Sequence, residues 1–268
     1  MIDATITNDA LADPKRFYDE RYAQGYMQDF SDLYEACRLF TVRSVLEKLA
    51  GEGFAPRDML DYGCGEGRYL QVWRQHFSGA SLTGCDISDH ALQIASRLAP
   101  DAALVPMRDE RVDLRDASFD LITSIEVLEH VRDADAAVAE LGRLLRPQGH
   151  LLLTTPSANP YSLEWWVNRL RGGLLPSFDG YGRFATDEPG HLRRLSDRQL
   201  LPLLRRHGLE PVRVYHRAHL FTPLSVRLGT RLRRAPKRLW VELALLDWHL
   251  LRRLPNGATV LVLARRVG

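Results

Sequence analysis

Residues 59–70, M-L-D-Y-G-C-G-E-G-R-Y-L, are the stretch around which the rest of this chain is organised. Two apolar residues and an acidic one lead into three alternate glycines, Gly63, Gly65 and Gly67, and an apolar helical start follows. This pattern predicts a strand, a tight turn and a helix, because glycines permit the turn and leave backbone N–H groups at a helix N-terminus open to a ligand. In a dinucleotide-binding loop, G-x-G-x-x-G, the third glycine comes one place later. The stretch therefore predicts a ligand-binding turn of another kind.

Length and composition set the outer bounds. The chain has 268 residues, 45% of them hydrophobic and 26% charged, so it can bury one substantial core and carry insertions. Its cysteines, Cys37, Cys64 and Cys85, show no C-x-x-C spacing, which is typical of a reducing compartment. The N-terminus has no signal-peptide pattern, and no apolar run approaches the roughly 20 residues that span a bilayer. We therefore expect a cytoplasmic protein.

Strand and helix signals alternate beyond the glycine turn. This order predicts a parallel sheet with helices on both faces. Before it, we expect aromatic residues to anchor short N-terminal helices to the core rather than to take part in a site. The predicted strands are 58–62, 81–87, 103–106, 119–125, 150–155, 211–217 and 258–264, and the predicted helices are 31–49, 68–76, 89–99, 134–145 and 196–207.

Three further motifs lie near strand ends. Asp86 ends the second strand about 20 residues past the glycine turn, where a doubly wound fold holds a ribose by its hydroxyls. Residues 118–131 end in E-V-L-E-H-V, and residues 144–151 read L-L-R-P-Q-G-H-L. Together with D-Y-G-C-G-E-G, these motifs resemble in order those of the class I S-adenosylmethionine-dependent methyltransferases. Gln148 departs from that pattern, because the family has glycine there.

The resemblance implies an α/β fold with a doubly wound, seven-stranded, mostly parallel Rossmann-like sheet whose last strand is antiparallel. It also implies S-adenosyl-L-methionine as the cofactor, with Asp61 near its methionine end and Asp86 at its ribose. The cofactor-binding residues that the resemblance carries over are Asp61, Gly63, Gly65, Gly67, Asp86, Ile87, Asp109 and Ile125.

The sequence leaves open which residue contacts the adenine amino group of the cofactor. The family usually has an acidic residue between the third and fourth strands. Counting back from Phe119, Arg108 falls at that position and Asp109 one place later. Either the loop is one residue shorter and Asp109 makes the contact, which we favour, or the backbone near Met107 reads the base.

Acidic and histidine side chains gather after the fourth strand. If that segment is helical, Glu126, Glu129 and His130 share one face of a turn. The stretch resembles ubiquinone-biosynthesis O-methyltransferases and small-RNA ribose 2′-O-methyltransferases, and these families imply a magnesium-class ion held by such a cluster. His191 is the available candidate for a fourth ligand. Relatives without a metal share the motif, so His130 or His191 as a general base is the other reading.

Two stretches depart from the alternating pattern. Residues 157–195 hold aromatic residues among glycines and prolines, and we expect them to cap the ligand. Residues 218–257 form a basic amphipathic insertion, which either packs on the domain, as we favour, or lies in an anionic membrane interface. On a helical wheel its apolar arc comprises Leu239, Trp240, Leu243, Leu246, Leu250, Leu251 and Leu254, and its basic residues include Arg227, Arg231, Arg233, Arg234, Lys237 and Arg238.

These features predict four segments and a function. Residues 1–50 form a helical segment over the cofactor site, 51–156 the cofactor-binding core, 157–195 the cap, and 196–268 the rest of the core with the insertion 218–257. We expect methylation of a small-molecule or lipid-linked acceptor, most simply at oxygen; peripheral contact with an anionic membrane follows only if the insertion does not pack on the domain. RNA ribose methylation and a non-catalytic cofactor-binding scaffold are the alternatives. Nucleic acid is disfavoured, because no nucleic-acid module is recognisable and the basic residues alternate with leucines and tryptophans.

Overall fold

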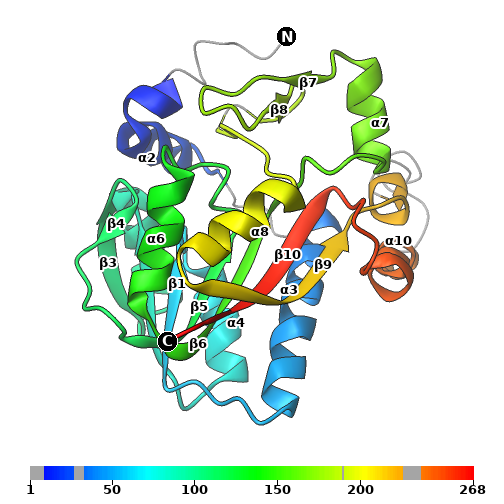
Figure 1. Ribbon diagram of the computed structural model, residues 1–268. Coiled ribbons are helices and arrows are strands. Elements are labelled where there is room, and N and C mark those ends of the chain that lie inside the picture. Colours follow the sequence, from blue (N-terminus) through cyan, green and yellow to red (C-terminus); the bar gives the residue numbers. More distant parts are fainter. Residues whose placement is uncertain (1–8, 27–32, 189, 226–236) are drawn as a thin grey trace.

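The computed structural model of the protein describes residues 9–26, 33–188, 190–225 and 237–268. Its centre is an eight-stranded sheet in the order β4-β3-β2-β1-β5-β6-β10-β9 (Figure 1). The strands β3, β2, β1, β5 and β6 run parallel, whereas β10 lies antiparallel between β6 and β9. The expected doubly wound sheet is confirmed, and its additional strand is β4, a two-residue edge strand. The bounds are β1 (Asp58–Tyr62), β2 (Ser81–Asp86), β3 (Ala103–Arg108), β4 (Arg111–Val112), β5 (Phe119–Ile125), β6 (Leu145–Pro156), β9 (Leu209–Arg217) and β10 (Thr259–Arg266).

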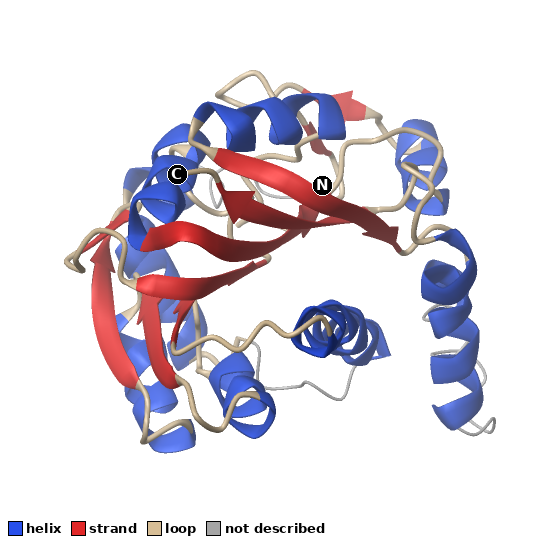
Figure 2. Cartoon of the chain, turned by 60° about the horizontal axis from the view of Figure 1, so that its bottom comes forward, coloured by secondary structure: helices blue, strands red, loops and turns tan. Residues whose placement is uncertain are grey.

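Helices cover both faces of this sheet (Figure 2). One face carries α6 (Ala134–Leu144) and α8 (Asp197–Arg206), and the other carries α3 (Leu33–Gly51) and α4 (Arg68–His76). The helix α5 (Asp89–Leu98) links β2 to β3. Among residues 9–26, 33–188, 190–225 and 237–268, every helix is too short or too polar to span a bilayer.

Alternate residues of each strand pack into two separate cores. In β5, Ile122 packs on the side of α6 and α8, whereas Leu121 packs with Met59 and Trp73 on the side of α3 and α4. Because both faces are covered, the strands are almost continuously apolar. Burying each large side chain stabilises the fold by roughly 1.5–3 kcal/mol. The sheet therefore forms a rigid base for the turns at its carboxyl edge.

Two segments lie above that edge. The helix α2 (Pro14–Ala23) comes from the N-terminal segment, and the cap consists of α7 (Leu163–Leu170) and the two-stranded sheet of β7 (Leu174–Leu175) and β8 (Arg183–Phe184). In Figure 1 both lie at the upper end of the main sheet, with α7, β7 and β8 uppermost. Part of the predicted N-terminal aromatic set, Phe30, lies outside the described residues.

The C-terminal insertion packs inward, although not along the predicted arc. Trp240 of α10 (Lys237–Leu246) is buried, and Trp248 of the π-helical turn η1 (Asp247–Leu251) packs on Tyr215 with ring centroids 5.4 Å apart. Leu250, a member of the predicted arc, is 67% exposed. At Leu250 the wheel of constant pitch fails because the π-helical turn changes the angle between successive side chains, whereas Leu239, 49% exposed, departs from the arc before that turn. The basic residues Arg227, Arg231, Arg233 and Arg234 lie outside the described residues.

Candidate active site

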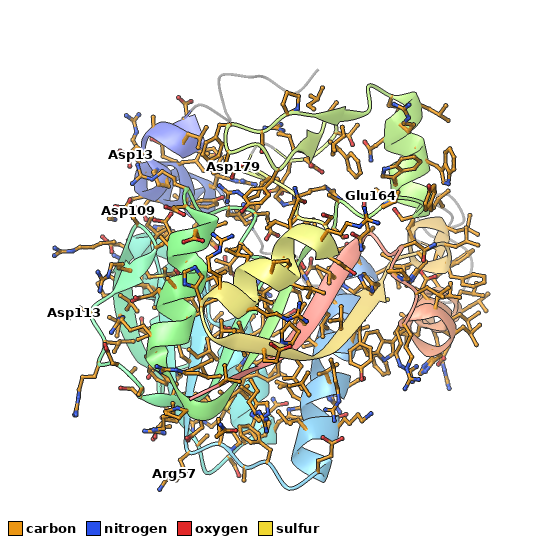
Figure 3. All side chains as sticks on the ribbon, in the orientation of Figure 1. Asp13, Arg57, Asp109, Asp113, Glu164 and Asp179 are labelled. Atoms are coloured by element: carbon orange, nitrogen blue, oxygen red, sulfur yellow. The ribbon has the colours of Figure 1, made fainter. Side chains whose placement is uncertain are left out.

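A cavity of about 440 Å³ lies at the carboxyl ends of β1, β2, β3 and β5. One wall consists of the glycine turn and the ends of β2 and β3, and the other of α2, α3 and the cap. In Figure 3, Asp109 and Glu164, both on the wall, lie on opposite sides of the upper end of the sheet, whereas Arg57 lies at the lower end. This edge is where a doubly wound fold binds ligands.

The three glycines of the turn have different surroundings. All have left-handed backbone conformations, with φ of 75° at Gly63, 51° at Gly65 and 78° at Gly67. Gly63 and Gly65 line the cavity, and a Cβ on Gly65 would lie 2.7 Å from the Tyr22 hydroxyl oxygen. Gly67 instead begins α4, where a Cβ would lie 3.0 Å from the Cβ of Ala95. The third glycine therefore serves helix packing rather than ligand access.

Two acidic residues flank this turn. Asp61 is buried beneath it, where its Oδ1 accepts a hydrogen bond from the Thr123 hydroxyl at 2.7 Å and its Oδ2 has no partner among the described residues. Burial raises the pKa of Asp61 to about 7. Glu66 lines the cavity, accepts from Arg68 at 3.0 Å, and has a second carboxylate oxygen without a partner in the described ranges. Sequence reasoning missed Glu66, the acid that the turn places on the wall.

Asp86 closes β2 and fixes the glycine turn. Its Oδ2 accepts from the Gly65 N–H at 2.8 Å, and its Oδ1 accepts from the Ser88 N–H at 2.9 Å. Burial raises the pKa of Asp86, and these backbone hydrogen bonds oppose that effect. Ser88 caps α5 by accepting from Ala91, so Asp86 is not needed as the cap. Its oxygens line the cavity and retain lone pairs for ribose hydroxyls.

The remaining predicted cofactor contacts also reach the cavity. Ile87, Ile125 and Asp109 line its wall, as does Met107. Asp109 has a φ of 52°, and its carboxylate pairs with Arg132. Both alternatives for the adenine contact, Asp109 and the backbone near Met107, therefore lie on the cavity wall.

Glu126 does not share a helical face with Glu129 and His130, contrary to the expectation. Its φ is 56°, in the left-handed region, so the chain turns sharply directly after β5. Its carboxylate accepts from the Thr154 hydroxyl at 2.8 Å and lies 3.7 Å from Arg38 and 3.8 Å from Arg217. Burial opposes ionisation, but these two guanidinium groups lower the pKa of Glu126 below its usual value. Glu126 is therefore an ionised residue of the wall.

Glu129, His130 and His191 form a cluster whose potential ligand atoms all lie within 4.8 Å of one another. The two imidazole rings have centroids 4.8 Å apart. Burial lowers the pKa of His130, and burial together with His130 lowers that of His191 to about 3. Burial and the nearby Glu126 raise the pKa of Glu129 well above its usual value. The structure thus brings three of the four predicted metal candidates together and leaves Glu126 apart.

The rings of α2 anchor the helix, as expected, because Tyr18 and Tyr22 pack with Ala91. The helix also contacts this cluster directly, which was the less favoured alternative. The Tyr18 hydroxyl lies 2.8 Å from Nδ1 of His130, and the Gly190 carbonyl oxygen lies 2.9 Å from the same nitrogen. A carbonyl only accepts, so His130 carries its proton on Nδ1 and leaves Nε2 with a lone pair. No spacing rule could find a contact across 112 residues.

A carboxylate from the cap joins α2 to the cluster. Glu188 accepts from Arg21 at 3.1 Å and from the Tyr26 hydroxyl at 3.0 Å. Burial opposes its ionisation, but His130, His191 and Arg21 together lower the pKa of Glu188 to about 2. This part of the cavity therefore carries the negative charge of Glu188 next to two imidazoles whose pKa values are lowered.

The inner side of the cap is polar rather than aromatic. The side chain of Arg194 lines the cavity, donates to Glu164 at 2.8 Å and pairs with Asp187 at 2.5 Å. The aromatic residues of the cap are distributed differently: Phe184 is buried, and Tyr161, Trp166 and Phe178 are exposed. The cap lies over the cavity, as expected, but its rings do not form the wall.

The fold and the cavity define a Rossmann-like protein that binds a nucleoside-containing cofactor. Residues 33–214 match the model of the family described as "Methyltransferase domain". The chain therefore belongs to this family, the class I S-adenosylmethionine-dependent methyltransferases.

Relatives and solved structures agree with this assignment. The ubiquinone biosynthesis O-methyltransferase of Alkalilimnicola ehrlichii is 37% identical over 115 residues, which cover 41% of this chain and 46% of the relative. That of Pseudomonas paraeruginosa is 32% identical over 114 residues, covering 40% and 48%. The chain spans about half the length of these curated relatives.

The solved structures show the same fold. A putative sarcosine dimethylglycine methyltransferase from Galdieria sulphuraria has a TM-score of 0.59 at 19% identity, covering 85% of this chain and 86% of the other. A methyltransferase from Mesorhizobium loti has a TM-score of 0.55 at 22% identity, covering 87% and 100%. At these identities the likeness concerns the fold alone.

Proposed function

We propose that this protein transfers a methyl group from S-adenosyl-L-methionine to an oxygen of a small-molecule or lipid-linked acceptor. One observation carries the proposal: a single cavity joins the glycine turn and Asp86 to the half-buried imidazoles of His130 and His191. The curated relatives named as O-methyltransferases support oxygen as the acceptor atom.

The cofactor half of the cavity fits the methyl donor. The cofactor supplies a methyl group on a positively charged sulfur, and its amino-acid end carries an ammonium and a carboxylate. Glu66 has a free carboxylate oxygen for the ammonium, and Arg38 on the wall provides a cation for the carboxylate. Asp86 accepts from ribose hydroxyls, and Asp109 or the backbone near Met107 contacts the base. Asp61 lies beneath the turn, where its carboxyl accepts a hydrogen bond from Thr123, and it is not part of the cavity wall.

The acceptor half supplies a base. A hydroxyl must lose its proton before or during methyl transfer, and a positioned side chain speeds such a step by about 10²–10⁴-fold. His130 is neutral because burial lowers its pKa, and its Nε2 lone pair is unprotonated, since Nδ1 donates to Gly190. His130 therefore takes the acceptor proton, and α2 and the cap exclude water. Alignment of the acceptor oxygen with the methyl group contributes the remaining acceleration.

A divalent ion is the alternative way to activate the hydroxyl. The residues fit such an ion, because Glu129 Oε1 and His191 Nδ1 are buried and have no hydrogen-bond partner within the described ranges. Glu129, His130 and His191 would hold it, and it would lower the pKa of a bound hydroxyl. Glu126 would not join them, because Thr154, Arg38 and Arg217 already surround its carboxylate.

Incubation of cell extract with radiolabelled cofactor tests the proposal, with products separated into lipid, small-molecule and RNA fractions. We expect label in the lipid or small-molecule fraction and a loss of about 10²-fold or more in His130→Ala, with unchanged affinity for S-adenosylhomocysteine. His249→Ala, an exposed histidine, is the matched control. Label confined to RNA would contradict the acceptor class, and tight cofactor binding without any transfer would indicate a scaffold.

A further inference from the structure

Exposed apolar side chains lie on the cap and on C-terminal segments that are hydrogen-bonded to it. We call this set the leucine face, and its members are Tyr161, Trp166, Leu170, Leu220, Leu250 and Leu254. Leu170 is 86% exposed, Leu250 67% and Trp166 51%. Single exposed leucines are ordinary on a protein surface, but a contiguous apolar patch marks a contact site.

Hydrogen bonds hold the segments of this face beside one another. The Leu163 N–H donates to the His219 carbonyl at 2.9 Å, which joins α7 to the segment that carries Leu220. The Asp247 carboxylate accepts from the Leu220 N–H at 3.1 Å, which joins that segment to η1. Asn256 donates to the Tyr161 carbonyl at 3.5 Å. Figure 1 shows α7 and α10 on the same side of the molecule.

The charge around the leucine face is mainly positive. The acidic residues of its segments are engaged elsewhere: Glu164 binds Arg194 towards the cavity, and Asp247 is buried. The exposed Glu242 lies 3.9 Å from Arg238. Among the exposed basic residues that neighbour members of this face in the sequence, Arg169, Arg171 and Arg253 have no ion pair within the described ranges.

We propose that the leucine face docks on an anionic lipid surface. Leucines bury their side chains at the boundary between head groups and acyl chains, tyrosine and tryptophan favour that boundary, and arginines among them attract anionic head groups. A protein partner would be expected to offer acids to these arginines through a fitted groove, whereas the elements that carry this face, α7 and the segment after α10, lie at the periphery of the molecule (Figure 1). The surface differs from the predicted helix face, because Trp240 and Trp248 are buried.

The position of the leucine face indicates from where a lipid-linked acceptor would enter the cavity. This indication rests on the proposed function, whereas the binding of lipid itself does not. Glu164 of α7 binds Arg194, which lines the cavity. The outer side of the cap is thus the leucine face, and its inner side is the cavity wall. A lipid-linked acceptor reaches the active site from the surface on which the cap docks.

Co-sedimentation of the full chain with vesicles tests lipid binding without any turnover. The vesicles contain phosphatidylcholine alone or mixed with phosphatidylglycerol, at about 0.01 M and about 1 M salt, where charges are screened over about 30 Å and about 3 Å. We expect binding to the mixed vesicles that falls with salt. Arg169→Gln with Arg171→Gln should weaken binding at low salt at least about fivefold, since each arginine near an anionic surface contributes roughly 1 kcal/mol.

Trp166→Ser with Leu170→Ser should weaken binding at both salt concentrations. The matched controls are Leu98→Ser with Val267→Ser and Arg97→Gln with Arg115→Gln, which remove the same kinds of exposed side chain elsewhere. Wild-type protein that stays in the supernatant at low salt, or controls that lose as much binding as the variants, would overturn the proposal. So would self-association that Trp166→Ser with Leu170→Ser abolishes, since a second copy would then cover the face. Calorimetry with S-adenosylhomocysteine on the same samples reports separately on the proposed function.

Discussion

Asp61→Asn should change how the stability of the cofactor-free protein depends on pH. Burial raises the pKa of Asp61 from 3.8 to about 7. A raised pKa means that the stability contributed by this carboxyl is complete below about pH 4 and is lost as the pH rises through about 7. The shift is about three units, and each unit corresponds to about 1.4 kcal/mol, so ionisation destabilises the fold by about 4 kcal/mol as an upper value.

Urea unfolding of both proteins between about pH 4 and about pH 8 measures this effect. Asparagine stays neutral, so the wild type should lose stability relative to Asp61→Asn as the pH rises, by at least about 2 kcal/mol. The variant can be less stable at low pH, because its amide finds no second partner, and only the pH dependence of the difference matters. Asp113→Asn, at the exposed Asp113 marked in Figure 3, controls for the loss of a carboxyl. A difference that stays flat across this range would refute the reasoning.

Three further outcomes are expected. Asp86→Ala should weaken S-adenosylhomocysteine binding at least about tenfold in calorimetry, because charge-assisted hydrogen bonds contribute about 1.5–3 kcal/mol each; unchanged affinity with an intact fold would place the ribose elsewhere. If Glu129 holds a divalent ion, chelation and Glu129→Gln should both abolish turnover while cofactor affinity persists, and activity indifferent to both would leave His130 as the base. Trp248→Ser should destabilise the protein by about 3–5 kcal/mol in a thermal melt, as for other large-to-small changes at buried aromatic positions; an unchanged melting temperature would contradict inward packing.

The sheet could be predicted from the sequence because its signals are local. In β1 and β5 both faces are buried, so each strand is a short, largely buried run next to turn residues, and the predicted bounds 58–62 and 119–125 agree with the structure. The strand β6 begins at Leu145, earlier than the predicted start at residue 150. The prediction was late because L-R-P-Q-G has the composition of a turn. Gln148 has a φ of 68° there, so the strand accommodates a residue where the family has glycine.

For the proposed acceptor half of the site, the sequence predicted which residue types are present but not how they are arranged. E-V-L-E-H-V correctly indicated acids and a histidine at the end of β5, but their relative directions depend on the backbone of Glu126. A left-handed residue there ends any helical periodicity, and nothing in the residue type indicates it, since glutamate seldom adopts positive φ. The contacts of His130 with Tyr18 and Gly190 join parts of the chain that only the complete fold brings together.

The position of His130 depends on the cap as much as on its own motif. Arg193 is fully buried and donates to the carbonyl oxygens of Leu128 at 2.9 Å, Arg132 at 2.9 Å and Val131. These are the carbonyls that the turn after β5 leaves without helical partners, and a buried carbonyl without a donor costs roughly 1–3 kcal/mol. Arg193 thus supplies donors that a helix would have supplied, from a distance of more than 60 residues in the sequence. The turn motif and the cap therefore form one structural unit, so a change in the cap that displaces Arg193 should move the imidazole of His130, the proposed base, even though such a change touches neither the cofactor half nor the acceptor.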